Sequence, residues 1–320
     1  MATARSFGLT IGERVAIEWI SLYPHWLLML AFESLGIVTF TYTRSGASDH
    51  GTVLGAADLV ICTEGNAPPG AMRVQIISHR WFEGVVTGKA EKDSSLPVLP
   101  PDAPLSDYFT SGTTGEAKHI IQTARMREHR TEMAQIRARF DAQSRFFIWP
   151  SFALQGIYVF AAACIRMGGC CVHNSRDGIA QTISKYRVSH MSVVPSVLAK
   201  TLNSLPDEFV KPDNLTVLKF GSTIENVLRS RAESKLATAL IETYSSNETG
   251  PISIVNSDGV GDILPSVEVE VVDEDHRSVW GKPASSGSRA AAVSMATKTI
   301  LTPRQECSAT AGFIPETPAL

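Results

Sequence analysis

The sequence lacks long apolar runs, an excess of charge of one sign, and any regular set of cysteines. Its longest apolar stretches, Trp26–Phe32 and Ile157–Ile165, are far shorter than the roughly 20 residues that span a bilayer. The segment Met1–Glu13 contains no continuous apolar region, so it does not resemble a secretory signal. We therefore predict a protein with no membrane span, located in the cytoplasm.

The charges nearly balance, with 29 Lys and Arg against 32 Asp and Glu and a net charge of -3. Such a chain has no overall basic field with which to hold nucleic acid or an anionic membrane, so we expect neither partner. The 44% apolar content of the 320 residues is enough to bury a sizeable core. The composition indicates a folded protein and leaves its oligomeric state open.

The five cysteines form an odd set without a repeating spacing, which favours reduced thiols over a disulfide framework. Cys170 and Cys171, followed by His173, raise the alternative of a metal site. Neighbouring residues on an extended segment point to opposite faces, and no second ligand pair is close in the sequence. We interpret these cysteines as small, buried apolar side chains.

Hydrophobic periodicity predicts strands that alternate with helices, beginning with a strand, helix, strand unit over residues 15–42. This alternation predicts an α/β fold with largely parallel sheets and a smaller β-rich part. The unit comprises Val15–Trp19, Tyr23–Leu35 and Ile37–Tyr42. Further strands are expected at Ala57–Cys62, Val74–Ile77, Phe146–Trp149, Cys170–His173, Met191–Val194, Leu215–Phe220 and Val267–Val272, and further helices at Arg125–Phe140, Ile179–Tyr186 and Asn226–Leu240.

The chain divides, by composition, into four parts. Residues 1–91 form an amino-terminal lobe, and residues 92–104 are a proline-rich surface connection. Residues 105–281 form a second α/β lobe with a closing β segment. Residues 282–320 are rich in Ala, Ser and Thr and sustain neither the helical nor the strand period, so we expect them to be poorly ordered.

The segment Thr110–Lys118, which follows the proline-rich connection, has the composition of a phosphate cradle. Its two glycines allow close approach of the backbone to an anion, its hydroxyls can donate to phosphate oxygens, and Lys118 adds a positive charge. The spacing does not fit a Walker A loop, which disfavours a P-loop phosphotransferase. On composition alone, a solvated turn is the alternative.

The order of these residues closely resembles the signature Thr-Ser-Gly-Thr-Thr-Gly-x-Pro-Lys-Gly of the adenylate-forming superfamily, with Ala117 for Pro and His119 for Gly. A second segment, Tyr244–Gly250, resembles that family's Tyr-Gly-x-Thr-Glu motif, with Ser245 for Gly and Asn247 for Thr. The resemblance implies that ATP is bound by Thr110, Ser111, Gly112, Thr113, Thr114, Gly115, Lys118, Tyr244, Ser245, Ser246 and Asn247. It also implies that Glu248 helps to hold Mg²⁺.

Weaker matches lie between these two motifs. The segment Pro150–Ile157 is similar to the family's acid-pocket segment, which implies pocket positions at Ala153, Leu154, Gln155 and Gly156. Val194–Leu198 is similar to the family's Val-Pro-Thr-x-Leu. Phe220–Thr223 is similar to the turn that forms the adenine wall, which implies that Gly221, Ser222 and Thr223 contact the base. Ordinary core and turn residues are the alternative for each match taken singly.

The resemblance implies a ligase in which a carboxylate attacks the α-phosphorus of ATP and gives an acyl adenylate and pyrophosphate. Lys118 and Glu248 are the expected catalytic residues, with ATP and Mg²⁺ as cofactors. In acyl-CoA synthetases the acyl group then passes to coenzyme A, but a carrier protein is an alternative acceptor. The sequence does not identify the acid. A catalytically dead, nucleotide-binding or interaction remnant is the alternative function.

The family pattern stops after Val279, and the expected downstream motifs and small carboxy-terminal domain do not follow. Joining the last base of each codon to the first two of the next, from Gly281, permits Glu-Ala-Gly-Glu across Gly281–Ser285. The same shift permits Met-Phe-Arg-Asp-Gly-Trp-Phe-Tyr-Pro-Gly-Asp across Glu306–Thr317, which is close to the family's ribose motif. We interpret Lys282–Leu320 as a frameshift product and expect the chain to be weak or inactive.

Overall fold

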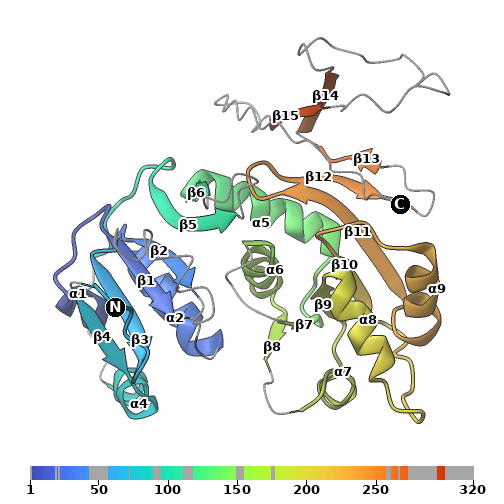
Figure 1. Cartoon of the computed structure of the whole chain (residues 1–320), viewed down its shortest axis with the longest axis horizontal. Coiled ribbons are helices and arrows are strands. Elements are labelled where there is room, and N and C mark those ends of the chain that lie inside the picture. The colour runs from blue at the N-terminus through green and yellow to red at the C-terminus, as the bar shows by residue number, and fades with distance from the viewer. Residues whose placement is uncertain are drawn as a thin grey trace. The chain divides into compact units, whose positions relative to one another are not determined.

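The computed structural model describes residues 2–18, 20, 22–42, 57–71, 73–88, 95–110, 118–148, 155–173, 177–256, 261–265, 267–272 and 294–299. The chain forms two compact units, Met1–Val188 and Ser189–Leu320. Figure 1 colours the chain from blue at the amino terminus to red at the carboxyl terminus. In the described part of the chain, no helix has both the length and the apolar character needed to cross a membrane.

The first unit contains a six-stranded sheet with the strand order β4-β3-β1-β2-β5-β6 (Figure 1). Strands β1 to β4 pair in parallel, β5 pairs in parallel with β2, and β6 returns antiparallel to β5. Val15, Ala16 and Ile17 in β1 are completely buried, as expected for a central strand of a parallel sheet. The strands are β1 (Arg14–Glu18), β2 (Val38–Tyr42), β3 (Leu59–Thr63), β4 (Val74–Ile77), β5 (Pro104–Thr110) and β6 (Lys118–Thr123).

Helices and a short strand pair complete the first unit. Helix α5 packs on α6, and α6 packs on the parallel strands β7 and β8. Phe140, Phe146 and Phe160 form an aromatic cluster there, with ring centroids 5.6 to 6.4 Å apart. The elements are α1 (Ala2–Ser6), α2 (Leu22–Glu33), α4 (His79–Thr87), α5 (Ala124–Ala138), β7 (Arg145–Phe147), α6 (Gln155–Arg166), β8 (Cys170–Val172) and α7 (Ile179–Tyr186).

The second unit contains strands in the order β13-β12-β11-β10-β9, together with helices α8 and α9. Strands β9, β10 and β11 are parallel, whereas β11, β12 and β13 are antiparallel neighbours. A separate antiparallel pair joins β14 to β15. The elements are β9 (His190–Val193), α8 (Pro195–Asn203), β10 (Thr216–Lys219), α9 (Asn226–Lys235), β11 (Ala239–Ser246), β12 (Gly250–Val255), β13 (Gly261–Ile263), β14 (Val267–Val272) and β15 (Ser294–Thr299).

The predicted α/β fold with largely parallel sheets is confirmed. Each of the predicted strands coincides with an observed strand to within about two residues, and the predicted unit over residues 15–42 appears as β1, α2 and β2. Strand β15 lies inside the stretch 282–320, for which the sequence predicted no regular element. The rest of that stretch lies outside the described residues.

Two predictions are wrong in part. The helix expected over Asn226–Leu240 ends at Lys235, because the backbone N–H groups of Thr238 and Ala239 donate to the Leu215 carbonyl and the chain enters β11. The cysteine prediction also fails at Cys170, which is exposed on the short strand β8, while Cys62 and Cys164 are buried as expected. All four described cysteines are free thiols.

Candidate functional site

Three of the sequence motifs begin where parallel strands of the second unit end. Lys219, the last residue of β10, is paired with Val193 on β9 and with Glu242 on β11. The segments that start at Val194 and at Phe220 therefore leave the sheet at one edge, at the carboxyl ends of β9 and β10. Tyr244 follows the same edge two residues beyond Glu242, where β11 continues in its antiparallel pairing with β12. Open α/β sheets bind ligands at this edge.

The turn that follows β10 combines a strained backbone with exposed hydroxyls. Gly221 has a φ of 85°, a conformation that L side chains rarely adopt. A Cβ at this position would lie 3.4 Å from Cγ1 of Val194, so the turn lies close to the start of α8. Gly221, Ser222 and Thr223 are exposed. The predicted adenine-wall residues are thus brought together on an accessible turn beside a second predicted motif.

The Tyr244–Gly250 motif forms the end of β11 and the turn into β12. Ser246 Oγ accepts a hydrogen bond from the Thr249 backbone N–H at 3.0 Å and lies 2.8 Å from Thr249 Oγ1. This closes a tight turn whose central residues are Asn247 and Glu248. Burial raises the pKa of the Tyr244 hydroxyl, which therefore stays protonated at neutral pH. The turn presents a half-buried carboxylate at Glu248.

The predicted phosphate-binding segment is flanked by the hairpin strands β5 and β6 of the first unit. Thr110 ends β5 and is paired with Lys118, which begins β6. Residues Ser111, Gly112, Thr113, Thr114 and Gly115 lie outside the described residues, so their contacts with phosphate stay a prediction.

The predicted acid-pocket segment reaches the described residues at the start of α6. Ala153 and Leu154 lie outside the described residues, whereas Gln155 and Gly156 are the first two residues of the helix. The Gln155 side chain is buried, and its Nε2 has no hydrogen-bond partner among the described residues. A Cβ on Gly156 would meet no atom within 4 Å. The start of α6 therefore carries a buried amide donor at Gln155.

A buried ion cluster beneath the strand ends was not found from the sequence. Lys219 Nζ lies 2.5 Å from Glu242 Oε1, and Arg229 of α9 contacts the other carboxylate oxygen. Lys219 and Glu242 are paired on neighbouring strands, immediately before two of the predicted binding segments. The signal that could have revealed the cluster is a lysine in an otherwise apolar strand, Thr216–Lys219.

The described residues fit a magnesium ion only if a ligand supplies most of its oxygens. Among them, no group of three or more His, Cys, Asp or Glu side chains is placed to hold a metal. Mg²⁺ is usually bound in proteins by one or two carboxylates together with substrate phosphates. The Glu248 carboxylate is suited to such a shared site, which stays a prediction.

The fold and the strand register define an α/β protein in which two loops follow the carboxyl ends of parallel strands, the edge at which open α/β sheets bind ligands. The family described as AMP-binding enzyme matches residues 4–287, so the chain belongs to this adenylate-forming family.

Curated relatives of the chain include fatty-acid ligases, and others are named as nonribosomal peptide synthetases. The chain is 25% identical over 252 residues to the fatty acid–[acyl-carrier-protein] ligase MmaC of Mycobacterium marinum, covering 73% of this chain and 46% of that protein. It is 26% identical over 216 residues to a long-chain-fatty-acid–CoA ligase of Yersinia pestis, covering 60% of this chain and 38% of that protein. The chain thus spans less than half the length of these relatives.

Solved structures share the fold at low sequence identity. ATP-bound MatB from Rhodopseudomonas palustris aligns with a TM-score of 0.75 at 17% identity, covering 93% of this chain and 62% of that chain. The N-terminal subdomain of Klebsiella oxytoca NpsA, in complex with 3-hydroxyanthranilyl-AMSN, aligns with a TM-score of 0.71 at 20% identity, covering 92% of this chain and 76% of that chain.

Proposed function

We propose that this chain is the nucleotide-binding part of a ligase that activates a carboxylic acid with ATP. The observation that carries the proposal is the register of β9, β10 and β11, which aligns three separate family motifs at one edge of a sheet. The family match over residues 4–287 supports the same reading. The products of the first step are an acyl adenylate and pyrophosphate.

In this proposal the second unit binds the adenine ring. The exposed turn over Gly221, Ser222 and Thr223 supplies a flat backbone wall, and the Tyr244 side chain supplies an aromatic face. The positive φ of Gly221 is required because the turn must reverse direction next to Val194. Substitution of Gly221 by a larger residue would therefore disturb the wall itself.

The phosphates are assigned to the segment between β5 and β6. Attack of the carboxylate on the α-phosphorus places additional charge on the phosphate oxygens and on the departing pyrophosphate. The Lys118 ammonium and the hydroxyls of Thr110, Ser111, Thr113 and Thr114 are donors suited to that charge.

Glu248 is assigned to the magnesium ion that accompanies ATP. Such an ion would offset phosphate charge and orient the triphosphate for in-line attack. The Ser246–Thr249 hydrogen bond fixes the turn that presents the Glu248 carboxylate. Glu248 therefore acts by holding charge in place, and no protein nucleophile is needed.

In the intact enzyme the acyl group is then passed to a thiol. The printed names of the curated relatives include both coenzyme A and acyl-carrier protein as thiol partners. We propose a thiol acceptor of one of these two kinds, with coenzyme A as the first to be tested.

The acid is proposed to lack an α-amino group. In our alignment Gln155 occupies the position where amino-acid-activating relatives use an Asp to hold the ammonium. Gln155 offers a neutral amide instead, and an ammonium without a compensating carboxylate is costly to bury. Its buried Nε2, which has no hydrogen-bond partner among the described residues, is suited to a polar group on an otherwise apolar acid.

The alternative is a remnant that binds nucleotide without turning it over. The substitutions Ala117, His119, Ser245 and Asn247 within the two main motifs favour this second reading. Binding and turnover must therefore be measured separately.

The proposal is tested by titration of the 320-residue chain with ATP and Mg²⁺ in a calorimeter. Because hydrogen bonds to charged groups contribute roughly 1.5 to 3 kcal/mol, we expect Lys118→Ala to raise the Kd for ATP about 10-fold to 100-fold. The control is Lys200→Ala, which removes an exposed lysine from α8. Equal affinity in the parent chain and in Lys118→Ala would refute the assignment.

A further inference from the structure

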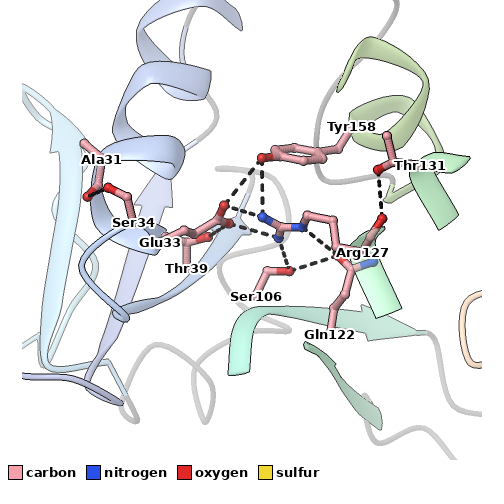
Figure 2. A network of polar contacts seen from close by, with 9 residues as sticks. All are labelled: Ala31, Glu33, Ser34, Thr39, Ser106, Gln122, Arg127, Thr131 and Tyr158. Atoms are coloured by element: carbon pink, nitrogen blue, oxygen red, sulfur yellow. Dashed lines mark hydrogen bonds and ion pairs between the residues drawn. The ribbon is translucent and has the colours of Figure 1, made fainter. Parts of the chain in front are cut away.

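Arg127, at the start of α5, lies at the centre of a buried polar network in the first unit (Figure 2). Its Nη1 and Nη2 contact both carboxylate oxygens of Glu33, the last residue of α2. Nη2 also donates to Ser106 Oγ at 2.7 Å, Nη1 to the Tyr158 hydroxyl at 3.3 Å, and Nε to Gln122 Oε1 at 3.2 Å. The five N–H donors of the guanidinium thus meet five acceptor contacts.

The network joins four elements to the hairpin of β5 and β6. Glu33 Oε1 also accepts a hydrogen bond of 2.7 Å from Thr39 on β2, and the Arg127 guanidinium lies 4.4 Å from the ring centroid of Tyr158 on α6. Ser106 belongs to β5 and Gln122 to β6, and Ser106 Oγ donates to Gln122 Oε1 at 3.3 Å. One side chain therefore contacts both strands of the hairpin.

Helix electrostatics do not favour these two charges where they stand. Glu33 places a negative charge at the carboxyl end of α2, and Arg127 places a positive charge in the first turn of α5. Each charge is opposed by the dipole of its own helix. Buried ion pairs can often be replaced by apolar side chains of similar size without loss of stability. Stability alone is therefore a weak reason for this pair.

The hairpin register is irregular at the network. The pairing of β5 with β6 shifts between Pro104 and Ser106, and from Ser106 paired with Gln122 it runs on to Thr110 paired with Lys118. Strand β5 joins β2 through the pairing of Ser106 with Thr39. A slip of one residue in this strand pair would turn every side chain to the opposite face, so the register beyond the irregularity must be specified by side-chain contacts or by the turn.

We propose that Arg127, held by Glu33, is a positioning residue that fixes the register of β5 and β6 and so determines which residues stand at their far ends. By contacting Ser106 and Gln122 together, the guanidinium selects the one pairing in which Thr110 is opposite Lys118. The functional part of this inference rests on the proposed function, because it assigns Lys118 to the phosphates of ATP.

The test replaces the pair by apolar side chains of similar length in the double variant Glu33→Leu/Arg127→Met. This avoids the buried, unpaired charge that a single substitution would leave. The matched control is Glu128→Leu/Arg166→Met, which removes an exposed two-bond ion pair between α5 and α6, with N–O distances of 2.6 and 2.8 Å. Arg127→Lys keeps the charge opposite Glu33 but loses the fork that reaches both strands. Hydrogen exchange, thermal midpoint and Kd for ATP are measured for each.

We expect amide exchange in β5 and β6 to rise at least about 10-fold in the double variant and in Arg127→Lys, while exchange in β1 and β3 stays unchanged. The Kd for ATP should rise at least about 10-fold, and the thermal midpoint of the double variant should move by less than about 4 °C. The control variant should match the parent chain in all three measurements.

Unchanged exchange in β5 and β6 would overturn the inference, even if ATP binding were altered. Exchange that rises evenly through the first unit, with a lowered midpoint, would also overturn it, because the pair would then be a general stabiliser. Failure of the proposed function is distinguishable, since it appears as a parent chain that binds no ATP or is insensitive to Lys118→Ala. In that case the claim about ATP binding is wrong, and the exchange rates alone test whether Arg127 fixes the register of β5 and β6.

Discussion

Both units of this protein contain buried side chains that carry a charge or a titratable ring. The Glu33–Arg127 pair joins residues 94 positions apart in the sequence, and Lys219 and Glu242 are 23 positions apart. The two partners of such a pair cannot be matched from local sequence, although a lysine in a strand such as Thr216–Lys219 can mark one of them. The motif residues could be predicted, because each motif is contiguous in the sequence.

His25 should make the stability of the chain depend on pH. Its ring is completely buried in α2, Nε2 lies 2.9 Å from Thr41 Oγ1, and burial lowers its pKa to about 4 from 6.5. The unfolded chain therefore binds a proton before the folded chain does. The contribution is fully present above pH 6.5 and is lost as the pH falls toward 4, at about 1.4 kcal/mol for each pH unit.

Urea unfolding at pH 7 and pH 4.5 measures this effect. The parent chain should lose about 2 to 3 kcal/mol more than His25→Phe over that interval, because the variant has no imidazole to protonate. His79→Gln is the control, since the His79 side chain is 87% exposed. Identical pH dependence in the parent and His25→Phe would show that His25 does not titrate in this way.

At the scale of the elements, the sequence predicted the helices and strands that have a clear hydrophobic period and a recognisable start and end. Strand β4 (Val74–Ile77) and helix α7 (Ile179–Tyr186) have the predicted bounds. Helix α4 was not predicted, although Ser78 caps it by accepting a hydrogen bond from the Trp81 backbone N–H at 3.1 Å. The end of α9 was misplaced because the pairing of β11 with β10 is a long-range interaction that overrides local helical preference.

The carboxylate of Glu242 should be essential for the pairing of β10 and β11. Glu242→Gln would leave the buried Lys219 and the partly buried Arg229 without their counter-ion. Removing one partner of a buried ion cluster typically costs about 3 to 5 kcal/mol. We therefore expect a large fall in the urea midpoint of unfolding.

The comparison for Glu242→Gln is Asp177→Asn, which removes the partner of Lys185 at a more exposed ion pair with an N–O distance of 3.1 Å. Exposed pairs contribute about 0 to 1 kcal/mol, so this variant should unfold nearly as the parent chain does. Equal stability of the two variants would contradict a structural role for the Lys219–Glu242–Arg229 cluster.

At the scale of the whole molecule, the candidate site could be predicted as a set of motifs but not as a geometry. The register that aligns Val194, Gly221 and Tyr244 comes from strand pairing between segments that the sequence shows only separately. The choice of acid could not be predicted, because several elements line a pocket and Gln155 is only one of the residues that would do so. The specificity for the acid depends on side chains outside the motifs.

The reading of residues 282–320 as a frameshift product gives a prediction for the whole chain. The nucleotide sequence around codon 281 should contain a one-base change whose reversal encodes Gly-Glu and, further on, Gly-Trp-Phe-Tyr-Pro-Gly-Asp. Sequencing of the gene checks this directly. A reading frame that encodes neither motif when shifted would refute the frameshift and leave the adenylate-forming assignment of residues 4–287 intact.

Acid-dependent exchange of pyrophosphate into ATP is the measurement that tests the central claim most directly. It should be made on the 320-residue chain, on a frame-restored chain and on the frame-restored Lys118→Ala variant, over one panel of fatty, aryl and amino acids. We predict exchange in the frame-restored chain with a fatty or aryl acid and about 10² to 10³ less with Lys118→Ala, since an aimed donor to developing charge is removed. We also predict little exchange in the 320-residue chain. Exchange that is absent with every acid, or that is unaffected by Lys118→Ala, would contradict the proposed function.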